Sequence, residues 1–174
     1  MMDEYLGAPV DAHYSCRGFA LRALARPLGL DDSQVWLPDG EHPNDYDLRI
    51  AEAGGVDLFL LASGASDGHV AFVAPGARRD GGTRVLALAE STRRDNLTTF
   101  PSFASLEEVP THGVSVGLGT IAAARRLRLV VHGAHKRDAA ARLLALDSFD
   151  PTWPASIVHE HPDSVVLVDR EALP

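Results

Sequence analysis

Hydrophobic and polar positions alternate along the chain in a pattern typical of strands followed by helices. Short apolar runs rich in leucine and valine predict strands at residues 56–62, 84–88, 127–131 and 164–168. Apolar residues at helical spacing predict helices at residues 16–28, 120–126 and 136–146. Because strands and helices alternate, the sequence predicts an α/β fold with a doubly wound, mostly parallel, Rossmann-like sheet.

Three other segments have distinct patterns. Residues 56–62 are almost continuously apolar, which predicts a strand buried on both faces, as in parallel sheets. Residues 37–47 are rich in proline, glycine and aspartate and predict a long surface loop. Residues 1–7 combine two acids, an aromatic residue and a glycine without a capping pattern, and a terminus of this kind is expected to fray.

The composition bounds the class of protein. The length of 174 residues suits a single domain over residues 1–174. Lys and Arg number 16 against 24 Asp and Glu, and this net charge of −8 argues against a nucleic-acid partner. The lone cysteine, Cys16, excludes an internal disulfide framework and a multi-cysteine zinc site, and its helical position favours a buried structural thiol. No leader or membrane-spanning pattern is present, so a soluble, cytoplasmic protein without a membrane partner is expected.

The loop after the predicted strand 56–62 carries the clearest candidate chemistry. Ligands of doubly wound folds bind at the carboxyl ends of strands, and Asp67-Gly68-His69 lies at such an end. The Asp67 carboxylate can orient the His69 imidazole, which can then act as an acid or base near neutral pH. The alternative from this spacing alone is an ordinary Asp-Gly turn with a hydrogen-bonded histidine.

Cations and other histidines add weaker signals. Arg93 and Lys136 lie at the edges of predicted elements and suit a phosphate ester, although solvated surface charge is the common alternative. His132 and His135, and likewise His159 and His161, have spacings that two metal ligands use. No third ligand follows from the spacing and no HExxH motif is present, so no metal site is predicted.

Several short motifs together resemble one family. Residues 60–72, Leu-Leu-Ala-Ser-Gly-Ala-Ser-Asp-Gly-His-Val-Ala-Phe, resemble the signature of glucosamine-6-phosphate deaminases, also called isomerases. Asp3-Glu4-Tyr5-Leu6-Gly7 is similar to the family's Asp-Glu-Tyr-Val-Gly, and Tyr14-Ser15 to a Ser-Tyr pair in reversed order. Later family motifs are matched, in the family's order, by residues 91–93, 116–120 and 131–136.

The resemblance implies a site and a reaction. In the family, the aspartate matching Asp3 carries a proton between carbon 2 and carbon 1 of the opened sugar, and the residues matching Asp67 and His69 promote ring opening. The residues matching Arg93 and Lys136 hold the phosphate, and Gly64 and Gly68 belong to the matching substrate loop. The implied reaction converts glucosamine 6-phosphate, or a close amino-sugar phosphate, to fructose 6-phosphate and ammonia. It requires no metal and no organic cofactor.

Two departures from the family pattern keep alternatives open. The family's Asn-Glu-Pro is replaced by Val73-Ala74-Pro75, so Ala74 stands where a glutamate assists the ring-opening histidine. The chain also starts at the Asp-Glu-Tyr motif, so the family's N-terminal strand and phosphate loop are missing and a longer natural product is expected. The alternatives are a related 6-phosphogluconolactonase and a catalytically inert sugar-phosphate-binding module. A missing strand would leave an unpaired sheet edge, which favours association into a homo-oligomer.

Overall fold

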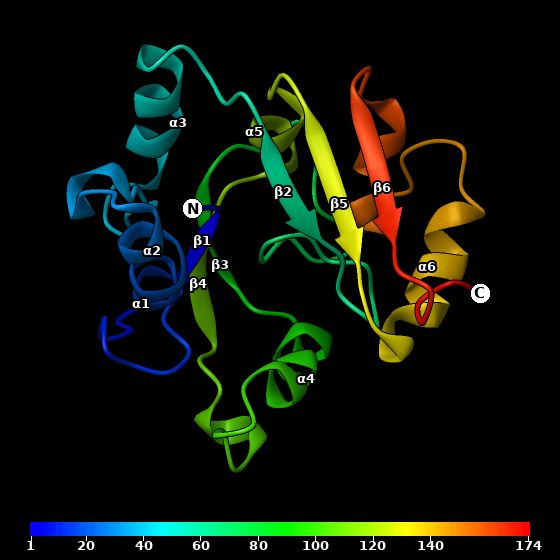
Figure 1. The fold of residues 1–174 in the computed structure, drawn as a ribbon, viewed down its shortest axis with the longest axis horizontal. Helices are drawn as coiled ribbons and strands as arrows, with labels where there is room; N and C mark the ends of the chain where they lie inside the picture. Colours follow the sequence, from blue (N-terminus) through cyan, green and yellow to red (C-terminus); the bar gives the residue numbers. More distant parts are fainter.

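The computed structural model describes all of residues 1–174 as a mixed α/β fold built on two three-stranded sheets (Figure 1). The strands are β1 (Asp3–Tyr5), β2 (Phe59–Ala62), β3 (Arg84–Ala87), β4 (His112–Ser115), β5 (Leu127–Val131) and β6 (Ser164–Val168). The α-helices are α1 (Cys16–Ala20), α2 (Arg26–Leu28), α3 (Pro43–Glu52), α4 (Glu90–Thr99), α5 (Leu118–Ala122) and α6 (Arg137–Leu144). A π-helical turn lies at Leu21–Ala25, and 3₁₀ segments lie at Asp32–Gln34, Leu106–Glu108, Ala134–Lys136 and Pro154–Glu160.

One sheet is parallel, in the order β2-β5-β6. The predicted strands at 127–131 and 164–168 match β5 and β6 residue for residue, whereas β2 begins at Phe59, three residues later than predicted. The α/β fold with a parallel sheet is therefore confirmed.

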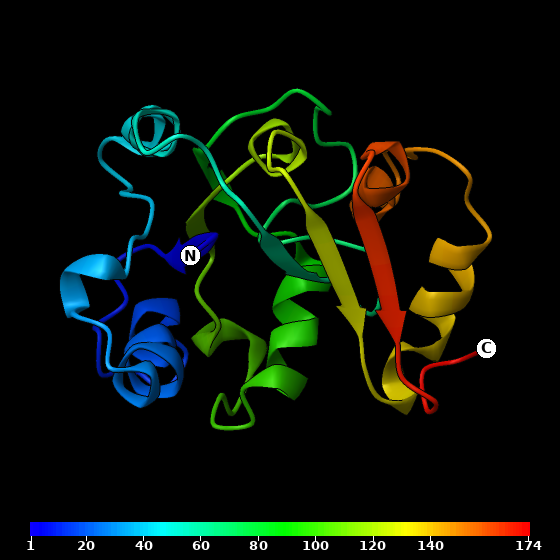
Figure 2. The same cartoon turned by 45° about the horizontal axis from the view of Figure 1, so that its top comes forward.

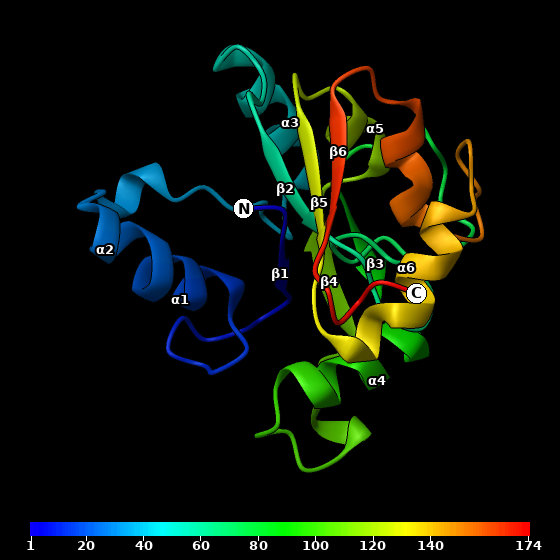
Figure 3. The same cartoon turned by 45° about the vertical axis from the view of Figure 1, so that its right-hand side comes forward.

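Helices cover only one face of this sheet. Leu61 and Leu129 point to a core of twenty buried residues, to which α5, α6 and the 3₁₀ segment Pro154–Glu160 contribute. These elements gather on one side of β2-β5-β6 in Figure 3. On the other face Leu60, Val130 and Leu167 are 65%, 41% and 50% exposed. The prediction that residues 56–62 are buried on both faces is thus wrong, because no helix packs on the second face.

The second sheet is antiparallel, in the order β1-β4-β3, and the sequence did not predict it. Strand β3 matches the predicted strand at 84–88, but it pairs with β4 and not with the parallel strands. The expectation that the first residues fray is also wrong. Asp3 pairs with Ser115 in β4, and the buried Tyr5 packs against Phe72 with ring centroids 4.7 Å apart.

The predicted helix at 16–28 is present, with the π-turn in its middle. Ser15 caps its start by accepting a hydrogen bond from the Gly18 N–H at 3.0 Å. The Glu4 carboxylate accepts hydrogen bonds from the backbone N–H groups of Cys16 and Arg17. These bonds attach β1 to the start of the helix. The helix ends at Gly29, whose φ of +67° is the left-handed conformation common after a helix.

Two helices were not predicted. Pro43 begins α3 inside the segment predicted as a loop, because proline, which disrupts a helix interior, is well tolerated in the first turn. Helix α4 is mostly polar, so its sequence carries no apolar stripe to reveal it. The two shorter predicted helices correspond to α5, which starts at Leu118, and to α6, which starts at Arg137.

The elements from the two ends of the chain occupy opposite ends of the molecule. Helices α1, α2 and α3 gather at one end, and β6 with the C-terminus lies at the other (Figure 2). None of the helices is long and apolar enough to cross a membrane.

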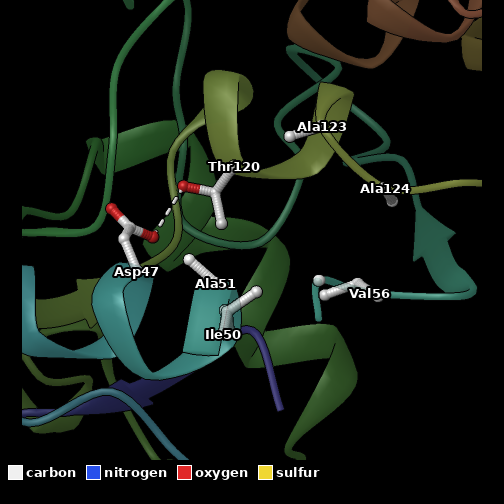
Figure 4. A pocket seen from close by; sticks show the side chains of 8 residues that line it. Asp47, Ile50, Ala51, Val56, Thr120, Ala123 and Ala124 are labelled. Carbon is white, nitrogen blue, oxygen red and sulfur yellow. Dashed lines mark hydrogen bonds between the residues drawn. The ribbon is translucent and has the colours of Figure 1, made fainter. Parts of the chain in front are cut away.

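A shallow pocket lies between α3 and α5 and is mostly apolar (Figure 4). Its one charged group, Asp47, accepts hydrogen bonds from the hydroxyls of Thr83 at 2.6 Å and Thr120 at 2.9 Å. The carboxylate therefore ties α3 to α5 and to the residue that precedes β3, and we assign this pocket a structural role.

Candidate active site

The loop at residues 63–69 follows the carboxyl end of β2 and meets two other elements there. Helix α4 lies near the carboxyl ends of the parallel strands (Figure 1). The 3₁₀ segment Ala134–Lys136 follows β5 at the same edge. This is the edge of an α/β sheet at which ligands bind.

Asp67 and His69 form a hydrogen-bonded pair. The Nδ1 atom of His69 lies 2.7 Å from Oδ1 of Asp67, and both side chains are largely buried. The Ser91 hydroxyl donates to the other carboxylate oxygen. Burial alone would raise the pKa of Asp67, but the hydrogen bonds from His69 and Ser91 outweigh it and lower the pKa to about 2. The structure therefore has the geometry that the sequence predicted, in which the Asp67 carboxylate orients the His69 imidazole.

Gly64 lies directly against this pair. A Cβ atom on Gly64 would fall 2.1 Å from Nδ1 of His69 and 2.8 Å from Oδ1 of Asp67. The Gly64 N–H also donates to the His69 carbonyl at 2.8 Å, which closes the loop. Only a residue without a side chain fits this place.

Gly68 is held from the other side by Trp153. Gly68 has a φ of +67°, and a Cβ atom there would fall 2.3 Å from the indole ring. The Ala155 N–H donates to the Gly68 carbonyl at 2.8 Å. The two glycines therefore have packing roles, and the predicted contact of either glycine with a substrate stays a prediction.

Asp3 reaches the same region from β1. Its side chain is partly buried, and its charge interacts with that of His69. Burial raises the pKa of Asp3 to about 6, with the Glu4 carboxylate adding to the rise and a hydrogen bond from the Cys16 thiol opposing it. A carboxyl group with this pKa can take up and release a proton near neutral pH. Cys16 is accordingly a partly buried thiol that is hydrogen-bonded to Asp3. Burial raises the pKa of the Cys16 thiol.

Lys136 lies beside the loop on the 3₁₀ segment after β5. Its Nζ donates to the Ser63 carbonyl at 2.7 Å. Burial lowers the pKa of Lys136, while the charges of Asp95 and Asp67 oppose that fall. A small pocket beside it is lined by Ala65, Asp95, Thr98, Thr99, His135 and Lys136.

Arg93 is placed differently from the other predicted residues. It lies on α4, but its guanidinium donates to the carbonyls of Leu106 and Val109, in the loop before β4. Its Nε is buried without a hydrogen-bond partner. The structure thus gives Arg93 a loop-fastening contact, and phosphate binding by Arg93 stays a prediction.

Helix α4 contributes side chains whose roles in the site were not predicted. Thr92 lies 3.4 Å from Nδ1 of His69, and Asp95 accepts hydrogen bonds from the loop. These residues were missed because α4 has no apolar periodicity and because their contacts are distant in sequence. Ser91 and Thr92 were noticed only as part of a motif.

Asp67, His69 and Asp95 have ligand-type atoms within 4.8 Å of one another. Nδ1 of His69 is committed to Asp67, and Oδ2 of Asp95 is committed to two backbone N–H groups. We therefore interpret the group as a hydrogen-bonded charge cluster and assign no metal ligand. His159 and His161 each bond to a backbone carbonyl through Nε2.

Comparison with known proteins places the site in context. The sequence matches the model of the family described as Glucosamine-6-phosphate isomerases/6-phosphogluconolactonase over residues 2–167. The chain is 36% identical over 177 residues to a glucosamine-6-phosphate deaminase from Shouchella clausii, covering 98% of the chain and 70% of that relative. It is 38% identical over 187 residues to the enzyme of that name from Bifidobacterium longum subsp. infantis, covering 98% of the chain and 67% of that relative.

Solved structures agree with the sequence comparisons. A monomeric glucosamine-6-phosphate deaminase superposes with a TM-score of 0.89 at 31% identity, over 98% of this chain and 71% of that one. The 6-phosphogluconolactonase from Trypanosoma brucei superposes with a TM-score of 0.64 at 22% identity, over 99% of this chain and 71% of that one, and this likeness concerns the fold alone. The chain belongs to the family of glucosamine-6-phosphate isomerases and 6-phosphogluconolactonases.

Proposed function

We propose that the chain is an enzyme that converts glucosamine 6-phosphate, or a close amino-sugar phosphate, to fructose 6-phosphate and ammonia. The observation that carries the proposal is the Asp67–His69 pair, hydrogen-bonded at 2.7 Å, together with the Asp3 carboxyl, whose charge interacts with that of the same histidine. The names of the relatives at 36% and 38% identity support the same reaction.

The residues divide the reaction between them. His69, oriented by Asp67, donates a proton to the ring oxygen and accepts the proton of the carbon 1 hydroxyl as the sugar opens to its aldehyde form. Asp3 then removes the proton from carbon 2 while His69 returns its proton to the carbon 1 oxygen, which gives an enolamine. Asp3 next delivers its proton to carbon 1. Water adds to the resulting imine at carbon 2, and ammonia leaves. A pKa of about 6 suits Asp3 to both halves of this transfer, because the carboxylate is the main form at pH 7 and its protonated form lies only about 1.4 kcal/mol higher.

Lys136 and Arg93 are proposed to hold the phosphate. The position of Lys136 supports this role, because its ammonium group bonds to the loop at the Ser63 carbonyl, borders the small pocket and interacts with the charge of Asp67. For Arg93 the role requires its guanidinium to leave the carbonyls of Leu106 and Val109. The proposed steps use no cofactor.

A lactonase and an inert binding module are the competing functions. Lactone hydrolysis could use the same His69 as a base toward water, and the lactonase structures share the fold. The inert module is favoured by Ala74, whose methyl group can neither accept a hydrogen bond nor carry a proton.

Product analysis separates the three functions. The purified chain is incubated in turn with glucosamine 6-phosphate and with 6-phosphogluconolactone, and ketose phosphate, ammonia and lactone opening are measured. The proposal predicts equal amounts of ketose and ammonia from the amino sugar. Lactone opening without ketose supports the lactonase, and calorimetric binding of the amino sugar without either product supports the inert module. His69→Gln removes the proposed acid, and the exposed His42→Gln is its matched control.

We also propose that copies of this chain associate through the uncovered face of the parallel sheet. The exposed apolar side chains Leu60, Val130 and Leu167 lie on that face, and β2 pairs with a neighbour only on one side. Exposed apolar surface of this kind favours association. A cytoplasmic location stays a prediction.

A further inference from the structure

The segment that follows His69 lies against the strand that carries Asp3. Phe72 comes three residues after His69, and its ring packs on that of Tyr5 in β1 with centroids 4.7 Å apart. Gly113 of β4 lies against the same ring, because a Cβ atom there would fall 2.6 Å from it. Tyr5 and Gly113 are partners in the pairing of β1 with β4. Phe72 therefore covers the face of these two strands on which the Tyr5 side chain lies.

Ser115 lies directly opposite Asp3 on this same face. The two residues are Cα partners in the pairing of β1 with β4, two positions along from the pair that contains Tyr5. Side chains alternate between the faces of a strand, so Asp3 and Ser115 share the face that Phe72 covers. Cβ atoms of directly opposite residues are about 4.5–5.5 Å apart, which places the Ser115 hydroxyl beside the Asp3 side chain.

The Ser115 hydroxyl joins this strand position to the loop. It accepts a hydrogen bond from the Phe72 N–H at 3.2 Å and donates one to the Val116 carbonyl at 2.9 Å. Ser115 has no exposed surface, and Phe72 is also buried. A buried N–H without an acceptor is costly, so loss of the hydroxyl should let the loop backbone shift toward another partner.

A tight turn relates the position of Phe72 to that of His69. Val70 and Val73 exchange two backbone hydrogen bonds, of 3.3 and 2.9 Å, and Phe72 lies inside the turn that these bonds close. His69 directly precedes the turn. A shift of Phe72 should therefore move the whole turn and, with it, the backbone of His69.

We propose that Ser115 is a positioning residue, whose hydroxyl sets the distance between the loop that carries His69 and the carboxyl of Asp3. The inference rests on the proposed function, in which these two groups act on one sugar at adjacent carbons. An error in their separation would misalign one group while the other is in place. The role requires no contact between Ser115 and the substrate.

Three variants separate this role from simple stabilisation. Ser115→Ala removes the hydroxyl, and Ser115→Thr keeps it. The matched control is Ser156→Ala, because Ser156 is equally buried and its hydroxyl likewise accepts from a backbone N–H, that of Asp150 at 2.8 Å, and donates to a backbone carbonyl, that of Trp153 at 2.7 Å. The thermal unfolding midpoints of the two alanine variants should therefore fall by similar amounts.

The kinetic test follows exchange of the carbon 2 proton of glucosamine 6-phosphate in heavy water, at a temperature at which every variant is folded. A displacement of about 1 Å can cost roughly 100-fold in rate, so the maximal exchange rate of Ser115→Ala should fall by about tenfold or more. Its KM should change by less than about twofold. Ser115→Thr and Ser156→Ala should stay close to the parent rate.

Three kinetic results would overturn the inference. One is a parent exchange rate in Ser115→Ala, and another is an equal fall in Ser156→Ala, which would show that loss of any buried hydroxyl has this effect. The third is a folded Ser115→Thr chain that is as slow as Ser115→Ala.

A measurement without turnover separates the inference from the proposed function. Amide hydrogen exchange of Phe72 and the NMR shifts of the Phe72 and Tyr5 rings are recorded in the free protein. In Ser115→Ala the Phe72 N–H should exchange faster and both ring shifts should move. These changes in a chain without activity would support the placement of the loop by Ser115 while the proposed function fails. Parent exchange and parent ring shifts in Ser115→Ala would overturn the inference even in an active enzyme.

Discussion

The contact between Gly64 and His69 makes one substitution especially informative. In Gly64→Ala, the new methyl group would fall 2.1 Å from Nδ1 of His69, whereas ordinary contacts begin at 3.4 Å. The ring must therefore move by about 1.3 Å, the difference between these distances. The Gly64 backbone does not require a positive φ, so the cost arises from this contact and not from backbone strain.

The displacement should break the 2.7 Å bond between His69 and Asp67. A displacement of about 1 Å in a catalytic side chain can lower the rate by roughly 100-fold. We therefore expect the catalytic rate of Gly64→Ala to fall by about 100-fold or more. Overpacking and the lost charged hydrogen bond should also lower the free energy of unfolding by about 1–3 kcal/mol. The pKa of Asp67 should then rise from about 2 toward its usual range.

The assay combines initial rates on glucosamine 6-phosphate with urea unfolding and the NMR spectrum of the His69 ring. Ser66→Ala, at an exposed position of the same loop, is the control and should retain the parent rate and stability. A Gly64→Ala variant that keeps both the parent rate and the parent His69 resonance would show that Gly64 does not set the position of the ring.

Three further predictions concern stability and association. Asp3 has a pKa raised to about 6, so its ionised form opposes folding, and Asp3→Asn should be more stable than the parent by about 1–2 kcal/mol at pH 7. That difference should shrink as the pH falls from about 6 toward 4, which urea unfolding across pH can measure; a difference that grows on acidification contradicts it. Ala71 has a φ of +52°, and Ala71→Gly should raise the free energy of unfolding by roughly 0.5 kcal/mol, provided that relief of backbone strain outweighs the entropy cost of glycine; a large loss in urea unfolding would show that the strain is absent. Leu60→Lys, on the uncovered sheet face, should shift sedimentation toward the smaller species, and the same distribution in variant and parent would place association elsewhere.

The sequence predicted those parts of the fold that local patterns encode. Strands β5 and β6 are runs of leucine and valine with polar ends, and these runs are recognisable without any partner. The uncovered face of β2 was not predictable in the same way, because apolar residues 56–62 would fit a sheet covered on either one or both sides. Which face is covered depends on where α5 and α6 pack.

The antiparallel sheet depends on pairing between distant residues. Asp3 pairs with Ser115, and no local pattern near either residue reports that contact. Tyr5 and Asn96, which are likewise far apart in sequence, are joined by a 2.7 Å hydrogen bond. The terminus was therefore expected to fray, although long-range contacts hold it.

The candidate site was predictable where neighbours in sequence are also neighbours in space. Asp67 and His69 are two residues apart and bonded to one another, so their spacing carried the signal. Asp95 comes from a polar helix and contacts the loop across about thirty residues, so its sequence context gave no indication of a role. For Arg93 the motif was a poor guide to contacts. Its position in the motif predicted a phosphate ligand, whereas in the structure its guanidinium donates to backbone carbonyls.

We propose that Asp3 carries the proton between carbon 2 and carbon 1, in a site that it shares with Asp67 and His69. The most direct test follows the carbon 2 proton of glucosamine 6-phosphate by proton NMR in heavy water, with formation of fructose 6-phosphate in the same spectra. The parent chain and the exposed control Asp11→Asn should both lose the carbon 2 signal and form the ketose, whereas Asp3→Asn should do neither. Exchange and product that persist unchanged in Asp3→Asn would contradict the account.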